Sequence, residues 1–322
     1  MPKRTLGSLL ILFAVFGVAG MVWVNRFNIY DWSRLRNYTP PADVEQLVGK
    51  SGMNDYGQRL FYVNTPQISD RTTFNEECKA AEQTIVLGCY TGNNIYVFKV
   101  DDPKLSGVEE VTAAHEMLHA AYQRLSESEK AHVDAMVLAA YKRVNDPHLA
   151  EVVAGYNKTE PGQENNELHS ILGTEYANLG PELESYYGKY FSNRTKVVAL
   201  ASSYKKVFQD ISTQVGKYDA ELSLRKSEIN RRENALEQKA NQLEAQKAQM
   251  ESLLQSGQNE SYNAQVSGYN AAVNNYNYEI AAVRRLITEY NALVEQRNSL
   301  ALQQQGLANS LDSRLNTISN SK

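Results

Sequence analysis

The stretch Val111-Thr-Ala-Ala-His-Glu-Met-Leu-His-Ala-Ala-Tyr122 is the part of the chain around which the rest is interpreted. It lacks glycine and proline and is rich in Ala, Leu and Met, so it predicts a helix. His115 and His119 are four residues apart and share one helix face, which lets their imidazole nitrogens bind one metal ion. Glu116 lies about 100° further round the helix, close enough to hold a metal-bound water without being a ligand.

The alternative to a metal site is a surface helix with two histidines that bind nothing. The neighbours of the two histidines argue against it, because Val111, Met117 and Leu118 are apolar and imply that much of this helix is buried. Buried neutral histidines need polar partners, and a metal ion supplies one for both. The pattern therefore predicts a Zn²⁺ site.

A catalytic zinc ion usually has three protein ligands, and the histidine pair supplies two. The third is expected from a later helix, because no histidine follows at the H-E-x-x-H-x-x-G-x-x-H position. We favour Glu167, which would share a small polar stripe with Ser170, Thr174 and Asn178 on a helix predicted over 167–179. Glu175 and His169 are the alternative ligands, and an ordinary solvated helix residue is the alternative reading of Glu167.

The segments around this helix predict a small sheet and more helices. Residues 58–64, 84–90 and 95–100 are rich in β-branched and aromatic side chains and predict strands. Thr91-Gly-Asn-Asn94 is a turn sequence, so the last two strands should form a hairpin. Helices are expected over 42–49, over 126–144 behind a Ser126–Glu129 capping box, and from 182. Residues 156–166 read as a polar loop.

HEMLH on a helix after a hairpin strand, with Asn166-Glu167 at the start of a later helix, resembles the zincin metallopeptidases of the gluzincin type. The resemblance covers roughly residues 55–190. It implies peptide-bond hydrolysis by a zinc-bound water, with Glu116 as general base and with His115, His119 and Glu167 as ligands. The segment that would supply the third ligand lies further downstream of HEMLH than in the better-known patterns of such families. An oxyanion donor is also required, and Tyr156, His169 and Tyr176 are the candidates.

The first residues predict a membrane anchor. Lys3-Arg4 is followed by a stretch without charges from Thr5 to Asn25, and its apolar part is long enough to span a bilayer. We therefore expect a transmembrane helix over 1–26, a linker over 27–41, and a single-pass cell-membrane protein with an extracytoplasmic catalytic domain. The alternative is a cleavable signal peptide ending near Gly17-Val18-Ala19.

The two cysteines agree with an oxidising compartment. Cys78 and Cys89 are eleven residues apart and flank an apolar segment, which suits a local disulfide. Two reduced, buried cysteines are the alternative.

The last third of the chain predicts a coiled coil. Apolar residues recur every seven positions up to about residue 253, a polar break follows at 256–261, and a second heptad series then begins. The first series is Phe208, Val215, Leu222, Ile229, Leu236, Leu243 and Met250. The second starts with Tyr262, Tyr269 and Tyr276. Two such helices joined by a short break favour an intramolecular antiparallel hairpin over dimerisation, and the tyrosines read as a wide core layer rather than a binding face.

The sequence therefore predicts an α+β protein with a zincin-like metallopeptidase domain over 42–194 and a coiled-coil hairpin over 195–322. The expected partners are a peptide or protein substrate, the membrane through the N-terminal helix, and an envelope protein through the coiled coil. Nucleic acid is excluded, because the net charge of the chain is −4 and no Gly-rich phosphate loop appears. A non-enzymatic envelope scaffold with a structural metal is the alternative. A glycan hydrolase is weaker because no carboxylate pair accompanies the motif.

Overall fold

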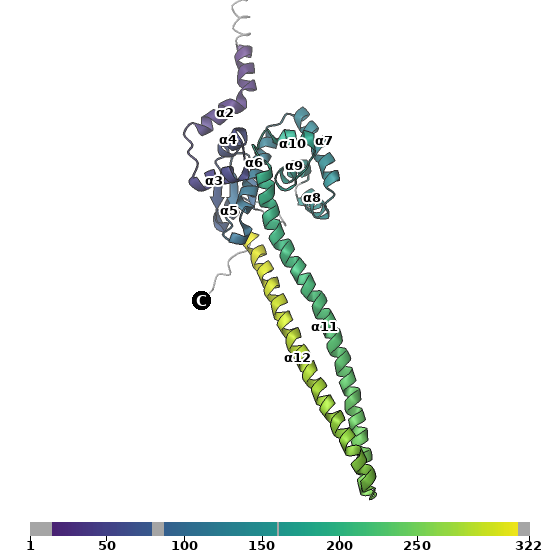
Figure 1. Ribbon diagram of the computed structural model, residues 1–322. Helices are drawn as coiled ribbons and strands as arrows, with labels where there is room; N and C mark the ends of the chain where they lie inside the picture. The colour runs from purple at the N-terminus through teal and green to yellow at the C-terminus, as the bar shows by residue number, and fades with distance from the viewer. Residues whose placement is uncertain (1–14, 79–86, 160, 315–322) are drawn as a thin grey trace, which may run out of the picture. The chain divides into compact units, whose positions relative to one another are not determined.

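The computed structural model describes residues 15–78, 87–159 and 161–314, and the chain divides into two compact units. Unit 1 comprises the residues up to Val207 and those from Leu307 onwards, and unit 2 comprises Phe208–Gly306. The described residues are mostly helical with one three-stranded sheet, which confirms the predicted α+β class (Figure 1).

Unit 1 consists of short helices around a small sheet. Helices that precede β2 in the chain include α2 (Arg26–Leu35), α3 (Ala42–Ser51), α4 (Asp55–Val63) and α5 (Arg71–Glu77). A single 3₁₀ turn, Pro103–Leu105, leads into the remaining helices. These are α6 (Val108–Gln123), α7 (Glu127–Val144), α8 (Pro147–Thr159), α9 (Glu164–Glu175) and α10 (Pro181–Tyr187).

The sheet has the order β1-β3-β2, from β1 (Gln67–Ser69), β2 (Gly88–Tyr90) and β3 (Ile95–Phe98). β1 lies parallel to β3, and β2 lies antiparallel to it with Cys89 opposite Tyr96. The predicted hairpin is therefore present, and β2 is an edge strand. Of the strand predicted over 84–90, residues 84–86 lie outside the described part.

Helix α6 runs through the core of unit 1, where α3, α4, α9 and the sheet pack around it. Its apolar side chains Ala114, Met117 and Leu118 have no exposed surface. Gly173 on α9 permits a close approach, because an added Cβ would collide with Leu118 and Tyr187. This packing fixes α9 beside the HEMLH turn of α6.

The strand predicted over 58–64 is wrong, because these residues form most of α4. Asn54 caps this helix, and its side-chain oxygen accepts hydrogen bonds from the N–H groups of Tyr56 and Gly57. Four consecutive apolar residues, 60–63, are buried, so the run shows no one-sided pattern. A fully buried helix turn and a buried strand have the same apolar signature over so short a length.

The polar loop predicted over 156–166 is shorter than expected. Helix α8 extends to Thr159 and α9 begins at Glu164, three residues before the predicted start. Helix α9 ends at Glu175 rather than at 179, because the backbone turns extended at Tyr176, with φ of −120° and ψ of 131°. The predicted helices over 42–49 and from 182 are confirmed as α3 and α10. The capping box of Ser126 and Glu129 is also confirmed at the start of α7.

Cys78 and Cys89 form a disulfide bond, as predicted. It connects the residue that ends α5 to the middle residue of the edge strand β2. The bond therefore fixes the middle of β2 to the small apolar cluster of Phe74, Tyr96 and Phe98.

The structure contradicts the predicted transmembrane anchor over 1–26. It therefore also contradicts the single-pass membrane localisation that depended on this anchor. Throughout the described residues, every helix is too short or too polar to cross a bilayer. Residues 1–14 of the predicted span lie outside the described part, and residues 15–24 are helical. The predicted linker over 27–41 contains α2.

Unit 2 is formed by most of α11 (Thr195–Gln255) and α12 (Asn259–Leu311), which are joined by a turn at Gly257 with φ of 76°. Ion pairs connect Asp219 to Arg297, Arg225 to Glu289 and Arg232 to Glu279. Because residue numbers rise along one helix as they fall along the other, the two helices are antiparallel within the unit. The heptad positions of both series are buried or partly buried, and this includes the tyrosines.

Candidate metal centre and its cleft

Helix α6 brings the two histidines of the HEMLH turn together. The ring centroids of His115 and His119 are 4.7 Å apart, and the ring planes meet at 77°. Their side chains are only 17% and 10% exposed. The four-residue spacing therefore produces the shared face that the sequence predicts.

Glu167 reaches the same point from α9. Its Oε2 lies 3.5 Å from His115 Nε2, and its Oε1 lies 3.4 Å from His119 Nε2. Both distances exceed those of ordinary N–H···O hydrogen bonds. They match the separation of two ligand atoms in a tetrahedral zinc site, roughly 3.3–3.5 Å for metal–ligand bonds of about 2.0–2.1 Å. The donor set of two imidazoles and one carboxylate fits a zinc ion.

The second oxygen of Glu167 supports the same reading. Glu167 Oε2 is buried and makes no hydrogen bond among the described residues, although a buried carboxylate oxygen normally has one. Glu167 as a whole is 7% exposed. A cation between the carboxylate and the imidazoles would satisfy this oxygen.

Neighbours on α9 orient the ring of His119. Its Nδ1 lies 3.0 Å from Asn166 Oδ1 and 3.3 Å from Ser170 Oγ. Asn166 Nδ2 donates to Gln163 Oε1, which leaves the amide oxygen of Asn166 for the imidazole. The proton on Nδ1 is thereby assigned, and Nε2 is the ring nitrogen on the side of Glu167.

The charges of the cluster are strongly coupled. Burial lowers the pKa of His115, but its contact with Glu167 and the negative charges of Glu116 and Glu167 raise that pKa to about 9 overall. Burial raises the pKa of Glu167, but the charge of His119 and the contact with His115 hold it below the ordinary value. Without a metal, the cluster is a buried ion pair, and a metal ion must displace a proton from it.

Glu116 lies beside the proposed ligands and against the edge strand. Ligand atoms of His115, Glu116 and His119 are all within 4.8 Å of one another. An added Cβ at Gly88 would lie 2.6 Å from Glu116 Oε1 and would also collide with Thr112. Glu167, at 3.5 Å from His115 and 3.4 Å from His119, and Glu116 are thus both carboxylates close to the two imidazoles.

A cleft of 560 Å³ opens beside this cluster. It is bordered by residues 88–92, by the C-terminal half of α6, and by Tyr156, Asn166 and Glu167. A smaller cavity of 170 Å³ adjoins His115 and Glu116, and its lining mixes apolar side chains with polar ones that include Thr112 and Glu175.

The edge strand β2 can present main-chain groups to this cleft. Thr91 N–H donates to Asn94, and Phe98 N–H donates to Leu87, so the odd-numbered residues bond to β3. Gly88 and Tyr90 therefore direct their N–H and C=O groups to the opposite edge.

The alternative ligands have other partners. Glu175 forms an ion pair with Lys205, although it also lines the 170 Å³ cavity with His115 and Glu116. His169 is fully buried, and its Nε2 contacts Tyr186 Oη at 2.9 Å. Burial, together with the charges of His119 and His115, lowers the pKa of His169 to about 3.

The three candidate oxyanion donors differ in whether they line the cleft. Tyr156 lines the cleft and hydrogen-bonds to Glu167. Tyr176 donates to Asp146 Oδ2 at 2.8 Å, and His169 belongs to the core. Tyr156 is the candidate that lines both cavities beside Glu116.

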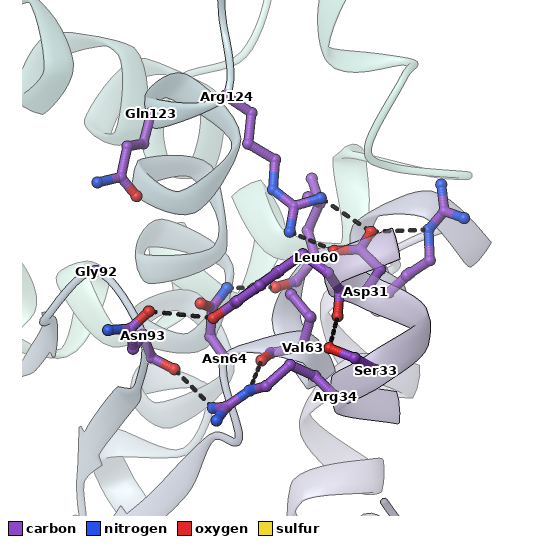
Figure 2. A network of polar contacts seen from close by, with 12 residues as sticks. Asp31, Ser33, Arg34, Leu60, Val63, Asn64, Gly92, Asn93, Gln123 and Arg124 are labelled. Carbon is purple, nitrogen blue, oxygen red and sulfur yellow. Dashed lines mark hydrogen bonds and ion pairs between the residues drawn. The ribbon is translucent and has the colours of Figure 1, made fainter. Parts of the chain in front are cut away.

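Polar contacts connect helix α2 to the end of α6 and to the turn after β2, which the sequence-based predictions did not include (Figure 2). Arg124, the residue after α6, forms two hydrogen bonds with Asp31 at 2.9 and 2.6 Å. Arg34 donates to the carbonyl of Asn93, in the turn that follows β2. These contacts join segments far apart in the sequence, so no local pattern could predict them.

No family model, no curated protein and no solved structure matches this chain.

Proposed function

We propose that this chain is a zinc-dependent peptidase. The observation that carries the proposal is the convergence of His115 Nε2, His119 Nε2 and the Glu167 carboxylate at tetrahedral ligand spacing, next to Glu116 and an open cleft. A structural zinc site is usually closed by four protein ligands, whereas a catalytic one keeps a position open to water.

His115, His119 and Glu167 would hold the ion. Zinc, when bound, lowers the pKa of a water molecule to near neutrality and polarises a carbonyl group. Glu116 takes a proton from the attacking water at a carboxylate oxygen and delivers it to the leaving amine as the C–N bond breaks. Tyr156, which lines the cleft, would turn from Glu167 to donate its hydroxyl proton to the carbonyl oxygen of the substrate.

A peptide substrate is favoured by the edge strand. An extended chain beside β2 can exchange main-chain hydrogen bonds with Gly88 and Tyr90. Gly88 has no side chain, so β2 can pack directly against Glu116 and Thr112 of α6. Main-chain pairing of this kind selects an extended peptide over a sugar or a nucleotide.

The Glu116→Gln variant tests the proposal. It removes the general base and leaves the three proposed ligands in place. We expect one zinc ion per chain in both proteins, and a fall in peptide hydrolysis of about 10²–10⁴-fold in the variant. Undiminished hydrolysis by the variant would refute the general-base role. Purified wild-type protein without bound zinc would refute the metal site.

The second candidate is a non-enzymatic scaffold in which the metal is structural and the helical hairpin binds a partner. Its support is unit 2, whose residues 208–306 lie mostly in two long antiparallel helical segments, one from α11 and one from α12. It predicts zinc in the wild-type protein without hydrolysis of any peptide. Removal of the zinc would then lower the thermal stability of unit 1.

A further inference from the structure

The cleft runs between strand β2 on one side and helix α6 on the other. Gly88, at the start of β2, lies against Thr112 and Glu116 of α6. Tyr90, at the end of β2, hydrogen-bonds through its hydroxyl to Gln123 at the end of α6. Strand and helix therefore run the same way along the cleft, with the proposed metal ligands between the two ends.

The two ends of the cleft carry different charges. The end near Thr112 opens onto the 170 Å³ cavity, whose lining includes the carboxylates of Glu116 and Glu175. The end near Gln123 is lined by Tyr122, Gln123, Lys130 and Gln163. Among the described residues that line the cleft, Lys130 is the one lysine or arginine.

Lys130 lies near the start of α7, and its Nζ is 5.8 Å from the centre of the Tyr122 ring. Its ion-pair partner is Glu127 at 3.4 Å, whose side chain is 94% exposed. An ion pair with so exposed a carboxylate contributes little. An ammonium group has three donors, so Lys130 can bind another carboxylate while it keeps the contact with Glu127.

We propose that Lys130 binds a carboxylate of the substrate, about two or three residues from the bond that is cleaved. This inference rests on the proposed peptidase function. From His119 to Gln123 the helix advances about 6 Å. That distance corresponds to roughly two residues of an extended peptide. The carboxylate can belong to an acidic side chain or to the C-terminus of the peptide.

The test compares the wild-type protein with Lys130→Met and Lys130→Glu, all loaded with zinc, on one peptide series. In the series, Asp or Glu replaces Asn or Gln at each of three positions on either side of the cleaved bond. A second set compares free with amidated C-termini. Lys142→Met is the matched control, because Lys142 is an exposed lysine on the same helix and does not line the cleft.

We expect kcat/KM to be about tenfold higher for the carboxylate-bearing peptide with the wild-type protein and with the Lys142→Met control. The preference should disappear in Lys130→Met and reverse towards lysine-containing peptides in Lys130→Glu. A preference confined to acidic residues would identify the side chain as the source. A preference confined to free C-termini would identify the terminal carboxylate.

Binding to the zinc-loaded Glu116→Gln variant, with and without Lys130→Met, separates this inference from the proposed function. Hydrolysis without any effect of Lys130 overturns the inference and leaves the peptidase proposal intact. A Lys130-dependent preference for carboxylate peptides in binding, without hydrolysis by the wild-type protein, supports the inference and overturns the peptidase proposal. Absence of both effects overturns both.

Discussion

At the scale of single residues, the proposed metal centre involves side chains that do not belong to the H-E-x-x-H pattern. Two residues of α9, Asn166 and Ser170, contact Nδ1 of His119. A ligand held by a hydrogen bond on its far nitrogen keeps one tautomer and one ring orientation. The affinity for metal should therefore depend on Asn166 although it is not a ligand.

Replacement of Asn166 by alanine should weaken zinc binding by about 10–100-fold, because His119 loses the acceptor that fixes its tautomer. Competition with a chromophoric chelator measures the effect. Asn165→Ala is the matched control, since Asn165 bonds to Asp134 rather than to a histidine. Equal affinities of the two variants would contradict the assigned role of Asn166.

A second residue-scale prediction concerns acid stability. Burial raises the pKa of Glu184, but its hydrogen bonds with Arg194 and with the Leu179 N–H hold that pKa below the ordinary value of 4.5. Because the folded-state pKa is lowered, the pair stabilises the fold fully above pH 4.5. The contribution is lost as the pH falls through the folded-state pKa.

Glu184→Gln should therefore be less stable than wild type at pH 7, and the difference should shrink as the pH falls below 4.5. Urea unfolding at several pH values between 3 and 7 measures this. Glu182→Gln, an exposed site on the same helix, should follow the wild-type curve. A difference that stays constant with pH would mean that the charge of Glu184 does not contribute.

At the scale of elements, the sequence predicts those parts whose signal is local. The HEMLH helix, the capping box of α7 and the hairpin turn before β3 each follow from a few neighbouring residues. Residues 58–64 form a helix instead of the predicted strand because a completely buried turn of helix has no polar face to reveal its period. The choice of Glu167 over Glu175 depends on how α9 packs on α6, and the close contact at Gly173 that fixes it has no sequence pattern of its own.

Gly88 should be the most sensitive position of the edge strand. A methyl group there would lie 2.6 Å from Glu116 Oε1 and would collide with Thr112, whose β-branched side chain has little freedom on a helix. Gly88→Ala should therefore displace the Glu116 carboxylate and lower kcat by about tenfold or more, while zinc remains bound.

Gly49→Ala is the control for this substitution, because Gly49 lies on α3 and nothing is within 4 Å of an added Cβ. It should keep full activity and be slightly more stable. Peptide hydrolysis and zinc content, measured on both variants, check the prediction. Wild-type kcat in Gly88→Ala would show that the strand does not control the position of Glu116.

At the scale of the whole molecule, the helical hairpin is an insertion between two parts of unit 1. Both Val207 and Leu307 belong to unit 1. Downstream of the hairpin, the Ser313 carbonyl accepts a hydrogen bond from Asn75 at 2.8 Å. The apolar core of unit 1 takes Val197, Ala201 and Tyr204 from α11 and nothing from residues 208–306. Each unit therefore buries its own apolar residues.

This division predicts that residues 208–306 can be replaced by a short Gly/Ser linker without loss of the metal centre. The shortened protein should bind one zinc ion per chain and hydrolyse small peptides within about twofold of the full-length rate, because every proposed ligand and every cleft residue lies in unit 1. Glu116→Gln in the shortened protein should abolish the activity and so prove that the same site is responsible. Loss of zinc on removal of the hairpin would show instead that unit 1 needs unit 2 to fold, and the scaffold interpretation would then gain ground, since the metal and the coiled coil would form one structural system.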